Sequence, residues 1–455
     1  MSSAEIVESA LAQCSVDAMT VICHDHSSTN LRWASNTLTT NGVMRSRDVT
    51  VIAVAAGGAG VASASVADTG DVAALVEQAE AAARAAGPAP DAAELVADAT
   101  SGDFTSEPVE TSPDVFAQFA PDLGDWFQRA RSAGQELFGF AEHELTTTYL
   151  GNTAGTRLRH VQPTGRLEVT GKSHDRSRST WVGRSTRDFG DIDVDLLHDD
   201  VSTRLGWADR TISLEAGRYE VLLPPTTVAD FLIYQYWTGA ARDAAEGRTV
   251  FSKPGGGTRI GERLSEQPIS VVSDPSYPGI ECTPFVVAEA SGSTESVFDN
   301  GLPLQRTAWI DDGQLAALGQ TRHSVALHGG ALTPMVDNLA LEVAGATDDL
   351  ASLISGTERG LLLTTLWYIR EVDPQTLLLT GLTRDGVYLV EKGEVVGAVN
   401  NFRFNESPVD LLSRVTGATT TETTLPREWS DFFTRTAMPA LRVRDFNMST
   451  VSQAS

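Results

Sequence analysis

The stretch that decides the fold reads Glu220-Val-Leu-Leu-Pro-Pro-Thr-Thr-Val-Ala-Asp-Phe-Leu-Ile-Tyr-Gln-Tyr-Trp237. Its first residues are typical of a strand, and the Pro-Pro pair ends it because proline has no backbone N–H to donate. A helix is expected to follow over residues 226–246. Its side chains are almost all large and apolar, so the helix should either pack into a core or line an apolar groove.

Length and charge limit the classes of protein that this chain can belong to. Its 455 residues predict two or three domains, since single cores rarely exceed about 250–300 residues. A net charge of −26 without a basic stripe excludes binding to a nucleic-acid backbone. A well-solvated acidic surface is the favoured meaning of this charge, and attraction of a cationic peptide is the alternative.

The cysteines and the N-terminus indicate a compartment. Cys14, Cys23 and Cys282 are an odd number without close pairing, which favours a reducing environment over a disulfide framework. The first residues, Met-Ser-Ser-Ala-Glu-Ile-Val-Glu, lack a basic and apolar signal segment. No apolar run approaches the roughly 18–20 residues of a membrane span. We therefore expect a cytoplasmic protein with no membrane partner.

Patterning along the chain predicts two domains. Residues 1–215 combine helical periodicity (3–14, 71–86 and 114–136) with strands, among them 19–23, 30–33 and 47–55, and so predict an α/β domain. Residues 216–455 hold the long helix and then short β-segments between Gly, Pro, Asn and Asp turns, as in a β-rich (α+β) domain. Asp312-Gly313 and Lys392-Gly393 are expected hairpin turns, and the first is the stronger signal.

Several motifs suggest chemistry but lack a required element. His24 and His26 flank Asp25 just after the predicted strand 19–23, yet no third metal ligand is marked nearby. Asp191-Ile-Asp-Val-Asp imitates the start of a calcium loop without its later glycine and glutamate, so an alternating strand or an exposed acidic turn is expected. Gly256-Gly-Thr-Arg-Ile-Gly261 is followed by Glu262 where a phosphate loop needs lysine. None of these segments predicts a site.

Three further segments share their order and spacing with a known family. They read Val297-Phe-Asp-Asn-Gly-Leu-Pro-Leu-Gln-Arg-Thr307, Asp385-Gly-Val-Tyr-Leu-Val-Glu-Lys-Gly-Glu394 and Asn401-Phe-Arg-Phe-Asn-Glu-Ser407. Together with the helix, they resemble the TldD/TldE (PmbA) family of peptidases. Catalytic members of that family carry a His-Glu-x-x-x-His zinc motif on this helix and a C-terminal cysteine ligand. The resemblance implies a TldD/PmbA-like fold.

The zinc motif falls on positions that cannot perform its chemistry here. Its two histidines and glutamate correspond to Ile233, Thr238 and Tyr234. Isoleucine has no donor atom, threonine is a weak ligand, and tyrosine, with a pKa of about 10, is a poor base. No cysteine follows Cys282. We therefore expect no catalytic residue, no metal site and no cofactor on this chain, with zinc only on a catalytic partner subunit.

The resemblance implies a function without catalysis. The favoured hypothesis is a TldE/PmbA-like subunit of a TldD-type metalloprotease assembly that processes unfolded or modified peptides. Trp33, Tyr236 and Trp237 are the expected lining of a peptide groove. One alternative is a homo-oligomeric protein that binds peptides without cleaving them. Another is a peptidase with an unrecognised site, for which Tyr234, His323 and His328 are the candidates.

Overall fold

The N-terminal part of the chain is built on one long antiparallel sheet. A computed structural model describes residues 1–66 and 69–452. The strand order is β3-β2-β1-β4-β5-β6, and every neighbouring pair is antiparallel. The strands are β1 (Ala18–Ala34), β2 (Thr37–Ala55), β3 (Gly58–Ser65), β4 (Gln135–Asn152), β5 (Arg157–Ser173) and β6 (Ser179–Thr186). The predicted strands 19–23 and 30–33 are thus parts of one strand, because polar residues 24–29 continue the same pairing.

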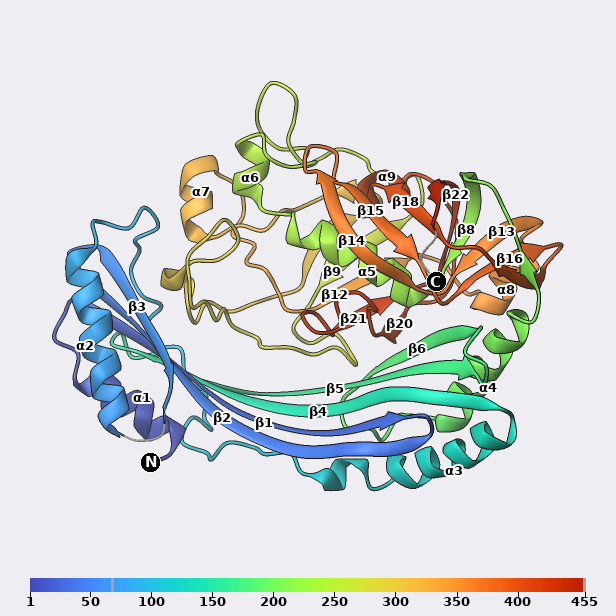
Figure 1. The fold of residues 1–455 in the computed structure, drawn as a ribbon. Coiled ribbons are helices and arrows are strands. Elements are labelled where there is room, and N and C mark those ends of the chain that lie inside the picture. The colour runs from blue at the N-terminus through green and yellow to red at the C-terminus, as the bar shows by residue number, and fades with distance from the viewer. Residues whose placement is uncertain (67–68, 453–455) are drawn as a thin grey trace.

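Helices cover only one face of this sheet. They are α1 (Ser3–Ala12), α2 (Thr69–Ala85), α3 (Phe119–Ser132) and α4 (Val194–Trp207), with a 3-10 turn η1 (Pro113–Phe116) before α3. In Figure 1, α1 and α2 lie at one end of the sheet, and α3 and α4 lie at the other. Alternate strand residues such as Val21 and Val51 pack under α1 and α2, as a period of two requires. Gly60 allows close approach here, since a Cβ would lie 2.2 Å from the backbone nitrogen of Ala83.

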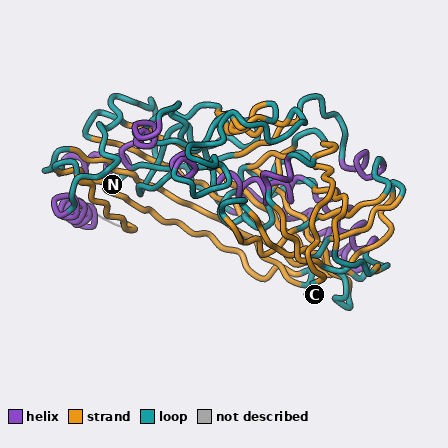
Figure 2. Tube along the Cα trace, turned by 90° about the horizontal axis from the view of Figure 1, so that it is seen from above, coloured by secondary structure: helices purple, strands orange, loops and turns teal. Residues whose placement is uncertain are grey.

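The opposite face of the sheet is turned toward the C-terminal half (Figure 1). Ile22, Ile52 and Leu150 project from it into a cluster with Phe285 and Phe298. Figure 2 shows the molecule from above, with long strands running from the side of the N-terminus toward the side of the C-terminus. The two halves therefore share a packed apolar contact.

The C-terminal half contains two sheets. One has the order β11-β10-β9-β12-β21-β20, and the other has the order β14-β15-β18-β22-β8-β13-β16-β17-β7, with β19 paired to β22. The strands of the first sheet are β9 (Ile269–Ser273), β10 (Thr307–Asp311), β11 (Gln314–Leu315), β12 (Leu339–Val343), β20 (Glu422–Thr424) and β21 (Thr436–Met438). Those of the second are β7 (Thr211–Ile212), β8 (Gly217–Leu223), β13 (Arg359–Leu363), β14 (Leu366–Asp373), β15 (Leu378–Thr383), β16 (Val387–Glu391), β17 (Glu394–Val399), β18 (Phe402–Glu406), β19 (Val415–Ala418) and β22 (Leu441–Val451).

Short helices and turns complete this half. They are α5 (Pro225–Trp237), α6 (Ala241–Ala245), η2 (Val297–Asp299), α7 (Arg322–His328), α8 (Leu350–Ser355) and α9 (Pro408–Leu412). Both predicted hairpins form, since positive φ angles at Asp312 (45°) and Gly313 (78°), and at Lys392 (52°) and Gly393 (82°), close β10–β11 and β16–β17. The predicted fold class, an α/β first part and a β-rich second part, is confirmed. No helix of the described residues is long and apolar enough to cross a membrane.

Candidate functional site

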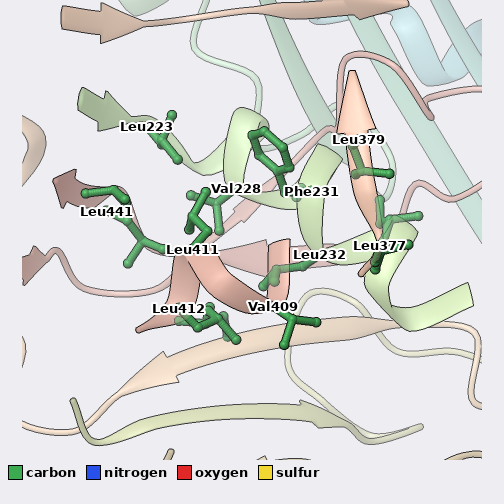
Figure 3. Close-up of a cluster of buried hydrophobic side chains, with 14 of the residues drawn as sticks. Leu223, Val228, Phe231, Leu232, Leu377, Leu379, Val409, Leu411, Leu412 and Leu441 are labelled. Carbon is green, nitrogen blue, oxygen red and sulfur yellow. The ribbon is translucent and has the colours of Figure 1, made fainter. Parts of the chain in front are cut away.

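Helix α5 lies in the core of the C-terminal half. Its cluster joins side chains of both sheets, for example Val271 and Ile310 of one and Phe404 and Phe446 of the other. Figure 3 shows Val228, Phe231 and Leu232 of α5 among leucines from β8, β15, β22 and α9. A helix that is apolar on all sides is expected to be buried on all sides. Most of α5 is therefore structural, and only its C-terminal end is available to a ligand.

The predicted long helix over 226–246 is wrong, because α5 ends at Trp237 and α6 begins at Ala241. Between them, the Gly239 carbonyl accepts the N–H of Gly319 (2.7 Å), and the Ala241 N–H donates to the Gly319 carbonyl (2.9 Å). These bonds to another segment replace the helical ones, and glycine is a poor helix former. The break exposes Trp237 at the end of the helix.

None of the three motif positions offers a metal ligand. Ile233 is fully buried in the core, and Tyr234 packs edge-on against Trp429 at 5.5 Å between ring centroids. The Thr238 hydroxyl donates to the Gln235 carbonyl at 3.0 Å. The described residues contain no group of three or more His, Cys, Asp or Glu side chains arranged to hold a metal ion.

Aromatic rings fill the space next to these positions. The loop after β20 brings Trp429 and Phe433 against the end of α5, with Trp237 5.2 Å from Trp429 and 6.4 Å from Phe433. The Trp429 indole N–H donates to the Asp230 carbonyl at 2.8 Å, which fixes this loop on the helix. Tilted and edge-on pairs of this kind add stability beyond their buried area.

Asp230 is a buried carboxylate beneath the same loop. Its Oδ1 accepts the backbone N–H of Glu428 at 2.9 Å, and its Oδ2 has no hydrogen-bond partner among the described residues. Burial raises the pKa of the Asp230 carboxyl well above its ordinary range, and the nearby Glu428 carboxylate adds to the increase. Glu428 itself accepts the N–H groups of Tyr368 (3.1 Å) and Ile369 (3.0 Å).

The raised pKa predicts how stability depends on pH. At a pH above about 3.9, the ordinary pKa of aspartate, the Asp230 carboxyl ionises in the unfolded chain. In the folded protein it stays protonated up to a higher pH. Asp230 therefore lowers the free energy of unfolding as pH rises from that value to the raised folded pKa. In Asp230→Asn the amide oxygen still accepts the Glu428 N–H but cannot ionise, so we expect a flatter pH dependence in urea unfolding between pH 4 and 8. The exposed Asp199→Asn is the control, and equal slopes in both variants would contradict the assignment.

A groove of about 410 Å³ opens at the end of α5, a size typical of ligand pockets. Its lining mixes polar and apolar side chains from α5, from the segment between β9 and β10, from the segments before α7 and β12, and from the loop before β21. The lining residues are Tyr236, Trp237, Thr283, Phe285, Val286, Val287, Thr294, Glu295, Ser296, Asp299, Leu304, Thr321, Pro334, Met335, Val336, Asp337, Phe432 and Phe433. Two large aromatic side chains are exposed at it, Trp237 by 39% and Phe432 by 75%.

The segment that resembles the family motif at 297–307 shapes one wall of this groove. Asp299 lies on η2, and its Oδ1 accepts a hydrogen bond from the Arg322 Nε–H at 2.6 Å. The Asn300 side chain is buried and binds the Ala288 backbone on both sides, accepting its N–H (2.6 Å) and donating to its carbonyl (2.8 Å). These residues hold the chain that carries Phe285 and Glu295 in place.

The three residues expected to line a peptide groove lie in two different places in the structure. Tyr236 and Trp237 line the groove, and the Tyr236 hydroxyl donates to the Val336 carbonyl at 2.8 Å. Trp33 does not line it, because Trp33 is 3% exposed in the cluster under α3, 6.1 Å from the Phe127 ring. Gly139 leaves room for its indole, since a Cβ at Gly139 would lie 2.3 Å from it. Placing Trp33 in the groove was wrong because its strand face, opposite to that of His24, points toward the helices.

The histidine candidates are held in ordinary polar contacts. His24 and His26 share a face of β1, where they contact the hydroxyls of Thr148 (2.9 Å) and Thr146 (3.1 Å), respectively. Asp25 faces the other side of the sheet and pairs with Arg47 (2.9 Å). His323 and His328 lie on α7. A helix forms there because the Thr321 hydroxyl caps it by accepting the Ser324 N–H (3.1 Å).

The remaining sequence candidates have structural roles. Asp193 caps α4 by accepting the N–H groups of Asp195 (2.9 Å) and Leu196 (3.1 Å), so the acidic run is a helix start. Burial raises the pKa of the Cys23 and Cys282 thiols to about 12, which leaves both protonated near neutral pH. Phe432 and Glu295 of the groove were not predicted, since nothing in their local sequence marks either one.

Comparisons with known proteins place the chain in a family. The sequence profile of the PmbA/TldA metallopeptidase C-terminal domain matches residues 216–450, and that of PmbA/TldA metallopeptidase domain 1 matches residues 20–83. None of the curated protein sequences compared with the chain matches it significantly.

Solved structures share the fold at low sequence identity. TldE from Thermococcus kodakarensis is similar with a TM-score of 0.79 and 15% identity, over 95% of this chain and 96% of that chain. A protein described as a modulator of a DNA gyrase from Thermotoga maritima has a TM-score of 0.76 and 14% identity, over 94% and 95%. A similarly described protein from Bacteroides thetaiotaomicron has a TM-score of 0.75 and 14% identity, over 98% of each chain. With both domain profiles matched, the chain belongs to the TldD/TldE (PmbA) family, the PmbA/TldA metallopeptidases.

Proposed function

We propose that this chain is a TldE/PmbA-like subunit that binds peptide in an assembly whose zinc is carried by a TldD-type partner. The observation that carries the proposal is the replacement of the three motif positions by a buried isoleucine, a packed tyrosine and a threonine bonded to its own helix. Trp429 packs directly against two side chains of that helix end. A metal-bound water needs three protein ligands and an open position, and these side chains supply neither.

The groove supports a role in holding peptide. It has the volume of a ligand site, a lining that mixes polar and apolar side chains, and two aromatic side chains exposed at the same place. Exposed apolar side chains that lie together mark interaction sites. Retention of this groove next to a helix without zinc ligands favours substrate binding as the function of the chain. Three free cysteines agree with a cytoplasmic location.

The edge of the N-terminal sheet supports association with another subunit. Strand β3 pairs with β2 only over Asp48–Ala55, so the outer edge of residues 37–47 pairs with no strand of the described chain. Leu38, Val43 and Met44 are exposed along this edge, by 46% or more. An unprotected edge with apolar side chains is a template for pairing with another chain. A homo-oligomeric protein that binds peptides without cleaving them would use the same edge, and it is the second candidate function.

Purified protein is expected to contain no stoichiometric zinc by elemental analysis. In sedimentation at micromolar concentration it should form a dimer with a family member that carries the His-Glu-x-x-x-His motif, burying well over about 1,000 Å². Self-association alone would favour the homo-oligomeric alternative. One equivalent of tightly bound zinc, or a monomer under both conditions, would contradict the proposal.

A further inference from the structure

The groove at the end of α5 has an unbalanced charge. Its lining contains three carboxylates, Glu295, Asp299 and Asp337, and no lysine or arginine. Asp299 is paired with Arg322, and Asp337 is paired with Arg435. Among the described residues, the Glu295 carboxylate has neither a hydrogen-bond nor an ion-pair partner.

Glu295 is presented by a segment that is anchored on both sides. Just before it, the Ser293 hydroxyl donates to Asp243 at 2.8 Å, and just after it the Ser296 hydroxyl donates to Asp91 at 2.7 Å. The Glu295 carbonyl accepts the Gly292 N–H at 2.9 Å, which closes the turn. The Glu295 side chain is exposed at the groove, and desolvation by the groove walls, together with the charge of Glu289, raises the pKa of its carboxyl. A positive charge in the groove would offset both the desolvation of the Glu295 carboxylate and its repulsion by Glu289.

The aromatic lining suits the same ligand. Trp237 and Phe432 present exposed ring surface in the groove. Lysine and arginine bury their methylene groups along apolar surface while the charged end stays near water or a carboxylate, and a cation is also attracted to the face of an aromatic ring. A neutral apolar ligand would leave Glu295 desolvated and unpaired, and an acidic ligand would be repelled. The chain's net charge of −26 would further attract a cation.

We propose that this groove selects peptides carrying a lysine or arginine side chain next to an apolar residue, and that Glu295 is the specificity-determining residue that pairs with the cation. This inference takes from the proposed function only the assumption that the ligand is a peptide. It needs neither zinc nor the partner subunit, so it is tested on the isolated full chain.

The test compares three peptides by isothermal titration calorimetry at low salt. They are acetylated and amidated Ala-Leu-Lys-Phe-Ala and its counterparts with norleucine or glutamate in place of lysine. We expect the lysine peptide to bind about fivefold more tightly than the norleucine peptide, since a partly exposed ion pair contributes up to about 1 kcal/mol, and the glutamate peptide to bind most weakly. The advantage of lysine should shrink as salt is added.

Two variants distinguish the effect of the Glu295 charge on binding from the effect of the aromatic lining. Glu295→Gln should bring the lysine-to-norleucine ratio close to one while leaving the norleucine peptide's affinity unchanged. Phe432→Ala should weaken the lysine and norleucine peptides alike, and its side chain is exposed enough to be removed without unfolding the chain. The matched control is Glu77→Gln on the exposed face of α2. Equal affinity of the parent chain for lysine and norleucine, an unchanged ratio in Glu295→Gln, or no binding of any peptide would overturn the proposal. A lysine preference in a chain that forms no assembly would support it and contradict the subunit function alone.

Discussion

Replacement of Phe231 by alanine is expected to lower the free energy of unfolding of the C-terminal half by about 3–5 kcal/mol, the usual cost of deleting a buried phenylalanine ring. Phe231 is 1% exposed, and its ring lies 5.5 Å from that of Phe404 and 6.0 Å from that of Phe446. It joins α5 to β18 and β22, so the cavity would lie between the helix and the sheet.

Urea unfolding followed by tryptophan fluorescence measures this effect. Phe432→Ala is the matched control, because that side chain is 75% exposed and its removal should change stability by less than about 0.5 kcal/mol. A decrease in the free energy of unfolding of less than about 1 kcal/mol in Phe231→Ala would show that α5 is not a packed core element. It would contradict the structural role assigned to most of the helix.

The elements that local sequence determines were predicted correctly. Asp312-Gly313 and Lys392-Gly393 form the expected hairpin turns because each turn needs positive φ at both positions, which a polar residue followed by glycine supplies. The strand, Pro-Pro break and helix at 220–237 also form, since Pro225 occupies the first turn of α5, where no N–H is required. The β-rich character of the second half follows from the same turn signals.

The errors arose where distant contacts decide the structure. The end of α5 at Trp237 depends on Gly319, and no pattern near residue 238 indicates that pairing. Residues 24–29 are too polar to predict a strand, yet they are held between β2 and β4 on both edges. Trp33 looked available to a peptide, but α3 covers it.

The groove could be predicted only in part for the same reason. Tyr236 and Trp237 stand on the helix that the sequence identified, so the local sequence could mark them as candidates. Glu295 and Phe432 come from loops that reach the same place only after the chain has folded. A carboxylate without a partner is a property of the assembled groove, because its significance depends on Asp299 and Asp337 being paired with arginines.

The largest effect on activity is expected when this chain meets a zinc-bearing relative. Alone, it should hydrolyse no peptide, because Ile233, Tyr234 and Thr238 supply neither metal ligands nor a base of suitable pKa. Burial raises the pKa of the Tyr234 phenol above its ordinary value, which makes it a weaker candidate still near neutral pH. In the assembly, the groove would hold the peptide while the partner's zinc performs the chemistry.

The division of roles between this chain and a zinc-bearing partner is tested most directly by the rate of peptide hydrolysis in three samples. The samples are this chain alone, a family member with the His-Glu-x-x-x-His motif alone, and an equimolar mixture of the two. We expect no hydrolysis by this chain, a rate for the mixture above that of the partner alone, and loss of that rate with a zinc chelator. Hydrolysis by this chain alone, or a mixture no faster than the partner by itself, would contradict this division of roles.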